Sequence, residues 1–113
     1  MIAHRVVPAA LVVLAMALVA PPAPAAAADP AKIFATSCAP CHGKEGQPNA
    51  VFAKQGVRNF KDAAWQKATP DAEIEKTIRE GKKGTMMASF EKQYSAGEIK
   101  ALAAYVRTLG KKK

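Results

Sequence analysis

The chain has 113 residues, with 17 Lys and Arg against 9 Asp and Glu, which gives a formal net charge of +8. This length allows one small domain. The positive charge favours attraction to acidic partner surfaces over long distances.

Residues 1–28 differ in character from the rest and predict a cleavable signal peptide. A short basic start precedes an apolar run over residues 6–20, and small residues with several A-x-A choices follow. The run has 15 residues, fewer than the ~20 that a spanning helix needs. A retained, tilted anchor is the alternative. Cleavage after Ala28 would leave residues 29–113 as a single exported domain.

A first helix is predicted over residues 29–41. Asp29 is a suitable N-cap, Pro30 fits the first helical position, and Ile33 and Phe34 begin an apolar pattern at helical spacing. The most informative string of the chain lies at the end of this helix.

The string Cys38-Ala39-Pro40-Cys41-His42 is typical of covalent attachment of a c-type haem. Residues three and four apart lie on one face of a helical turn, about 5–6 Å apart. Both thiols can therefore reach the vinyl groups along one porphyrin edge, and His42 can bind the iron. Cys38 and Cys41 are accordingly expected to form thioethers and no disulfide.

Two other chemistries use a Cys-x-x-Cys pair. A structural zinc site needs four Cys or His ligands, and outside this string the chain has only His4. A thioredoxin-like dithiol requires a strand-and-helix framework, and no alternating β-branched runs predict such a sheet. Covalent haem is the favoured interpretation, with zinc and dithiol chemistry as its alternatives.

A loop is predicted over residues 43–48 from its Gly and Pro content. An iron-binding histidine normally donates its other ring N–H to a carbonyl, which fixes the ring. The carbonyl of Pro48, or of a near neighbour, is a candidate acceptor for His42. A plain turn proline is the alternative.

Residues 51–67 show an irregular pattern, with a short helix predicted over residues 62–67. Trp65 is a candidate donor to a haem propionate, because a buried indole N–H usually finds a partner. Arg58 is a second candidate. The alternatives are a Trp at the rim of the core and a solvated Arg.

A further helix is predicted to begin with Thr69 as N-cap and Pro70 at the first helical position. Ile74 and Ile78 mark its buried face. Gly81 is expected to end it.

Residues 81–90 form a Gly-flanked loop that contains Met86 and Met87, the only Met residues after residue 28. No second His follows residue 28 either, which excludes two histidine ligands in the exported domain. A thioether is a soft, neutral ligand that raises the reduction potential. One of the two Met residues is therefore the expected sixth ligand. The alternative is that both pack against the haem and the iron stays five-coordinate.

The last helix is predicted over residues 95–110. Ser95 and Glu98 form a capping box, and Gly110 is expected to close the helix. One apolar stripe follows the cap, made of Ile99, Leu102, Ala103, Val106 and Leu109. Tyr105 lies beside that stripe, where it is expected to meet Phe34 of the first helix.

With these parts in this order, residues 31–109 resemble a small bacterial monohaem class I cytochrome c. In that family the loop commonly reads Met-Pro-Ala-Phe, and Met87-Ala88-Ser89-Phe90 matches it in register. Ala88 stands in place of the family's proline. The resemblance implies Met87, rather than Met86, as the iron ligand. It also implies an all-α fold in which the N- and C-terminal helices cross and one or two middle helices wrap around the haem.

The resemblance further implies a periplasmic one-electron carrier rather than an enzyme. One haem c would be bound through Cys38 and Cys41, with its iron between His42 and Met87. The alternative function is a haem sensor or a small peroxidase-like protein with an open sixth iron site. A periplasmic metal-binding module is a more distant alternative.

The expected partners are redox proteins with acidic docking surfaces, namely a donor complex and a terminal oxidase or reductase. No nucleic acid is expected, the membrane is reached only through the partners, and the chain is expected to be a monomer. Lys44, Lys54, Lys82 and Lys83 flank the haem string and the Met loop, and are candidates to surround the exposed haem edge. A solubilising surface is the alternative for each.

Overall fold

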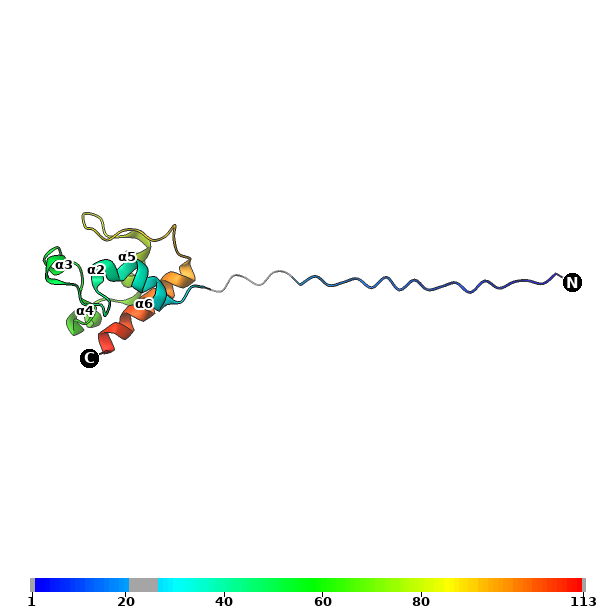
Figure 1. The fold of residues 1–113 in the computed structure, drawn as a ribbon, viewed down its shortest axis with the longest axis horizontal. Coiled ribbons are helices and arrows are strands. Elements are labelled where there is room, and N and C mark those ends of the chain that lie inside the picture. Colours follow the sequence, from blue (N-terminus) through cyan, green and yellow to red (C-terminus); the bar gives the residue numbers. More distant parts are fainter. Residues whose placement is uncertain (1, 21–26, 113) are drawn as a thin grey trace.

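The computed structural model describes residues 2–20 and 27–112, and in these it contains helices and turns but no strand (Figure 1). The helical segments are α1 (Pro30–Ile33), the π-helical η1 (Phe34–Cys38), α2 (Ala39–His42), α3 (Ala50–Lys54), α4 (Ala63–Ala68), α5 (Asp71–Glu80) and α6 (Ala96–Lys111). The expected all-α class is confirmed for these residues.

Residues 2–20 form no helix or strand, and their side chains are exposed. Across both described ranges, no helix combines the length and apolar character needed to span a bilayer. The expected signal peptide also covers residues 21–26, which lie outside the described residues. It stays a prediction.

The first helical run extends without a break from Pro30 to His42, one residue further than predicted. Asp29 caps its start, because the Asp29 carboxylate accepts a hydrogen bond from the Ala31 N–H at 3.0 Å. Gly43 follows its end with φ of 84°, and a Cβ there would lie 2.0 Å from the Gln47 carbonyl oxygen. Only glycine fits at that position without displacing the loop.

The core lies where α6 packs against the first helical run and against α5. The predicted capping box of α6 is confirmed, with Ser95 and Glu98 bonding each other's backbone N–H. The five stripe residues of α6 are all buried, and Tyr105 meets Phe34 with ring centroids 5.2 Å apart. The remaining buried apolar residues are Ile33, Phe34, Phe60, Ile74 and Ile78.

The predicted start of α5 is wrong by one residue. Pro70 is the N-cap, and the helix begins at Asp71. Thr69 instead ends α4, because its N–H donates to the Trp65 carbonyl at 3.0 Å and its own carbonyl accepts a bond from Arg107. The predicted end at Gly81, with φ of 73°, is confirmed.

Two further features of the structure differ from what the sequence predicts. Gly110 lies inside α6 instead of closing it, and a Cβ there would lie 2.8 Å from the Gln66 side chain. This glycine thus allows close packing of α6 against α4. The short helix α3 was not predicted; Asn49 caps it by accepting a bond from the Phe52 N–H at 3.0 Å.

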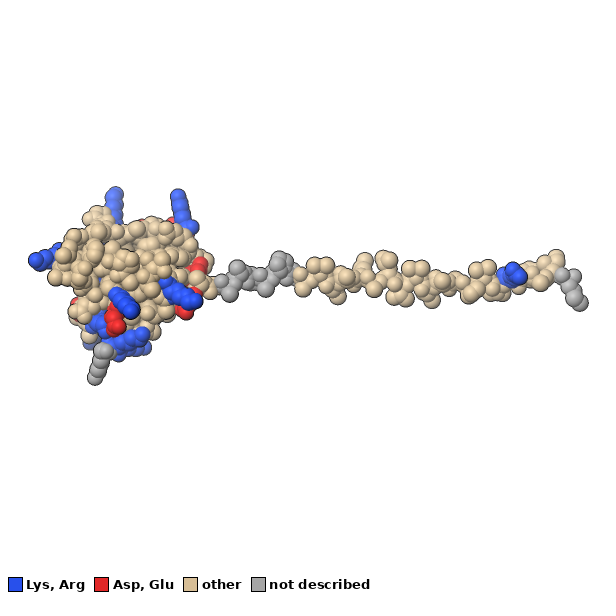
Figure 2. Space-filling model, in the orientation of Figure 1, with Lys and Arg blue, Asp and Glu red and all other residues tan. Residues whose placement is uncertain are grey.

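Lys and Arg side chains project from several parts of the surface drawn in Figure 2, where Asp and Glu are fewer. This distribution follows from 17 basic against 9 acidic residues in the chain. The helical part of the molecule therefore has a basic surface and a small apolar core.

Candidate haem site

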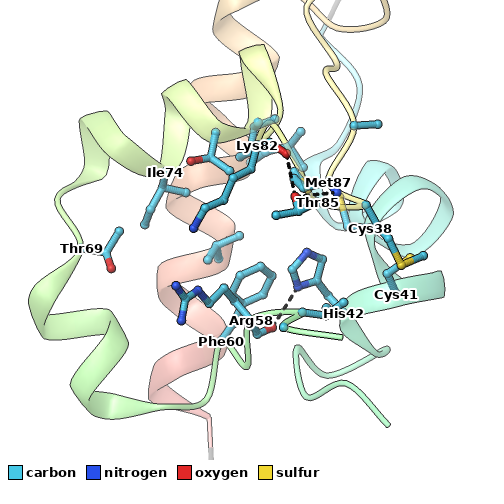
Figure 3. A pocket seen from close by; sticks show the side chains of 18 of the residues that line it. Cys38, Cys41, His42, Arg58, Phe60, Thr69, Ile74, Lys82, Thr85 and Met87 are labelled. Atoms are coloured by element: carbon cyan, nitrogen blue, oxygen red, sulfur yellow. Dashed lines mark hydrogen bonds between the residues drawn. The ribbon is translucent and has the colours of Figure 1, made fainter. Parts of the chain in front are cut away.

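A cavity of about 490 Å³ lies between the first helical run, the segment before α4, α5 and the loop after α5 (Figure 3). This volume falls in the roughly 300–1,000 Å³ range of small-molecule and cofactor sites. The structure brings all the predicted ligands to its wall, namely Cys38, Cys41, His42 and Met87. Three of these come from one helix and the fourth from a loop 45 residues beyond His42.

Cys38 and Cys41 are both free thiols that line the cavity. Burial, and to a smaller extent the neighbouring Cys41, raises the pKa of the Cys38 thiol to about 11. Cys38 is therefore protonated at neutral pH, since its surroundings disfavour a charged sulfur. A thioether is neutral, so covalent attachment at this sulfur is compatible with the apolar wall.

His42 is oriented by a hydrogen bond from its Nδ1 to the carbonyl oxygen of Arg58, at 3.0 Å. A carbonyl only accepts, so Nδ1 carries the proton and Nε2 keeps a free lone pair. Burial lowers the pKa of His42, and the bond to Arg58 partly offsets this effect. The neutral imidazole that binds metals is thus the favoured form.

The predicted acceptor at Pro48 is wrong. The loop turns at Gly43 and Gly46, where the Gly46 N–H donates to the Gly43 carbonyl at 3.0 Å. The Phe60 N–H then donates to the Gly46 carbonyl at 2.8 Å. This pairing brings residues 58–60 beside His42, so the acceptor comes from a segment 16 residues away.

Phe60 supports the His42 ring from its face, with ring centroids 4.3 Å apart and planes within 17°. Phe60 itself is buried and touches Trp65 and Phe34. Residue spacing does not indicate this contact, because Phe60 lies in an irregular segment with no helical or strand period. The histidine is therefore fixed at one ring edge and on one ring face.

Met86 and Met87 both line the cavity but differ in exposure. Met87 is half-buried and packs against the core, whereas Met86 is 59% exposed. The Met87 N–H donates to the Thr85 hydroxyl at 3.2 Å, and the Met87 carbonyl accepts from the Lys82 N–H at 3.1 Å. In Figure 3 this loop lies above the His42 ring.

The end of the cavity away from the cysteines is positively charged. Figure 3 shows the side chains of Arg58 and Lys82 extending to that side. Among the described residues that line the cavity, Arg58 and Lys82 are the only Lys or Arg residues, and Glu73 is the only Asp or Glu residue. Neither cation forms an ion pair with a described residue.

This donor set fits covalent haem. One wall offers two thiols and an imidazole with a free Nε2, and the facing loop offers a thioether. The cations at the far end suit carboxylate groups. No group of three or more His, Cys, Asp and Glu that could hold a metal ion occurs in residues 2–20 and 27–112, and the zinc alternative gains no support.

A family model described as "Cytochrome C oxidase, cbb3-type, subunit III" matches residues 25–106. Among solved structures, the KustC0563 c-type cytochrome is 36% identical, with a TM-score of 0.66. That match covers 73% of this chain and 98% of the other.

Other similar proteins are named as oxidase subunits. The cbb3-type cytochrome c oxidase subunit FixP of Azorhizobium caulinodans is 41% identical over 80 residues, covering 71% of this chain and 26% of the relative. The subunit CcoP of Cereibacter sphaeroides is 31% identical over 86 residues, covering 76% of this chain and 28% of the relative. The chain thus spans about a quarter of the length of these relatives.

Proposed function

Since the chain belongs to the family of cytochrome c oxidase, cbb3-type, subunit III, we propose that it is an exported one-electron carrier with its haem iron between His42 and Met87. Its fold is that of a small class I cytochrome c, and its cofactor is one covalent haem c. The observation that carries the proposal is the placement of His42 with a free Nε2 beside two thiols, below the Met87 loop.

When bound, haem c supplies a one-electron ferric/ferrous couple. In the proposed arrangement, Cys38 and Cys41 hold it by two thioether bonds. His42 presents Nε2 to the iron, because Nδ1 is engaged with the Arg58 carbonyl. The stacked Phe60 ring opposes rotation of the imidazole. Fixed ligands reduce the rearrangement that accompanies a change of iron charge.

Met87, rather than Met86, would be the second residue to bind the iron, because Met87 is half-buried and packs against the core, while Met86 is mostly exposed. Its neutral thioether favours ferrous iron and raises the reduction potential. The hydrogen bonds of the Met87 backbone to Thr85 and Lys82 hold the loop in place.

Arg58 and Lys82 are proposed to offset the charge of the haem propionates. Both cations extend to the end of the cavity away from Cys38 and Cys41, where they would pair with the propionates of a bound haem. A cation near a carboxylate stabilises it in a partly desolvated site. Trp65, which also lines the cavity, remains a further candidate donor.

The proposed electron acceptor is a membrane oxidase of the cbb3 type, because the curated relatives are named as its subunits. The proposed location is the periplasm, which the chain would reach by export, with the signal peptide cleaved after Ala28. The exposed lysines Lys44, Lys54, Lys82 and Lys83 support docking to acidic partners. The carrier is proposed to act as a monomer.

The test uses holoprotein made in a bacterium that attaches haem covalently. We expect the haem to stay with the chain on a denaturing gel, and a redox titration to follow a single one-electron step. The variants Cys38→Ser and Cys41→Ser should each reduce the attached haem. A colourless wild-type chain with both thiols open to alkylation would contradict the proposal, and tight binding of carbon monoxide at neutral pH would favour an open-site sensor or peroxidase.

A further inference from the structure

One hydroxyl pair connects the haem-binding helix to the segment that follows the Met loop. The Ser37 Oγ lies 2.5 Å from the Tyr94 hydroxyl oxygen, across 57 residues of sequence. Ser37 precedes Cys38, belongs to η1 and lines the cavity. Tyr94 is half-buried and stacks on Phe90, with centroids 6.0 Å apart and planes within 30°.

The π-helical form of η1 places this contact next to the haem string. The Ala39 N–H donates to the Phe34 carbonyl, five residues back, instead of to the usual fourth residue. Such π-helical turns occur frequently at functional sites. Ser37 and Cys38 therefore share the one turn in which the helix departs from α geometry.

The segment over residues 81–94 is attached on its other side to α5. The Phe90 N–H donates to the Ile78 carbonyl at 3.0 Å, and the Ser89 hydroxyl donates to the Arg79 carbonyl at 2.6 Å. In residues 2–20 and 27–112, the Ser37–Tyr94 contact is the only hydrogen bond between this segment and the helical run 30–42.

We propose that Tyr94 is a positioning residue that strengthens the bond between Met87 and the haem iron by holding the Met87 segment against the haem-binding helix through Ser37. This inference rests on the proposed ligation by Met87. The hydroxyl contact and the thioether–iron bond connect the same two parts of the molecule. A segment already held in its bound position loses less conformational freedom when the thioether binds, and binds more tightly for that reason.

The experiment measures how readily imidazole displaces Met87 from ferric holoprotein, followed by the near-infrared absorption band that a methionine–iron bond produces. Tyr94→Phe removes only the hydroxyl and keeps the ring that stacks on Phe90. We expect the band to persist in the variant and the apparent affinity for imidazole to rise by about fivefold, the effect of one lost hydrogen bond. The reduction potential should fall in parallel.

Ser37→Ala removes the same bond from the other side and should give the same rise. The double variant should add nothing further, because the two side chains act through one contact. Tyr105→Phe is the matched control. Tyr105 packs on Phe34 of the same helical run, and its hydroxyl has no hydrogen-bond partner among the described residues.

Three results would overturn the inference while leaving the proposed function intact. They are an unchanged imidazole affinity in Tyr94→Phe or Ser37→Ala, additive shifts in the double variant, and an equal shift in Tyr105→Phe. A wild-type spectrum without the methionine–iron band would instead contradict the proposed function. The band in the wild-type protein thus separates failure of the inference from failure of its premise.

Discussion

His42 and Met87 are held by different kinds of contact. The His42 ring has a hydrogen bond at one edge and the Phe60 ring on its face, so its own side chain is fixed. Met87 is fixed through its backbone, by bonds to Thr85 and Lys82. An unbranched thioether side chain keeps more rotational freedom than a stacked ring. Of the two proposed ligands, the methionine side chain is therefore the less firmly held.

Met87→Ala should abolish the near-infrared band of the ferric protein, lower the reduction potential and open the ferrous iron to carbon monoxide. Loss of a soft, neutral ligand accounts for each change. Met86→Ala is the matched control and should keep all three properties, because Met86 is 59% exposed. The reverse pattern, with the band lost in Met86→Ala alone, would assign the ligand to Met86.

Lys82→Gln should lower the reduction potential by roughly 10–40 mV at low salt. Removing a positive charge beside the cavity disfavours the state that carries the extra electron, and exposed charge pairs are worth roughly 0.2–1 kcal/mol. Lys83→Gln is the control, since Lys83 does not line the cavity. Redox titration of both variants checks this, and equal shifts would remove the specific role of Lys82.

At the scale of an element, the turn after the haem string depends on Gly43. Gly43→Ala should destabilise the holoprotein by roughly 3–4 kcal/mol, because the new Cβ would lie 2.0 Å from the Gln47 carbonyl oxygen. Gly56→Ala has nearly the same φ but open space around it, and should cost only about 1–2 kcal/mol. Denaturant unfolding measures both, and equal losses would contradict the steric argument.

The elements whose signals are local were predicted well from the sequence. The capping box at Ser95 and the stripe on α6 depend on residues within one helix, and both are confirmed. The predicted start of α5 is wrong because the Thr69 carbonyl accepts a hydrogen bond from Arg107, a residue 38 positions away. The prediction that Gly110 ends the last helix is wrong for the same kind of reason, since this glycine accommodates the distant Gln66 side chain.

In the candidate site, too, the residues with a local signal were predictable and those brought in by the fold were not. The haem string made Cys38, Cys41 and His42 candidates, because their spacing within one helical turn lets two thiols and an imidazole reach one haem. The carbonyl that orients His42 belongs to Arg58, and any residue type provides a backbone carbonyl, so composition and spacing do not identify it. The Phe60 ring likewise reaches His42 only through the fold of the loop at Gly46.

For the whole molecule, the excess of positive charge predicts how the proposed carrier meets its partners. The rate of electron transfer to an acidic redox protein should fall steeply as salt is added, since the screening length is ~10 Å at 0.1 M ionic strength. Stopped-flow absorbance measures this rate. Transfer to a small uncharged reagent is the control and should change little. A flat salt profile with the acidic protein would remove electrostatic docking from the account.

The proposed ligation has one covalent haem c with its iron between His42 and Met87. The near-infrared absorption spectrum of the ferric wild-type holoprotein at neutral pH tests it most directly. We expect a weak methionine–iron band that disappears on reduction. A ferric spectrum without that band, from protein with its haem fully attached, would contradict it.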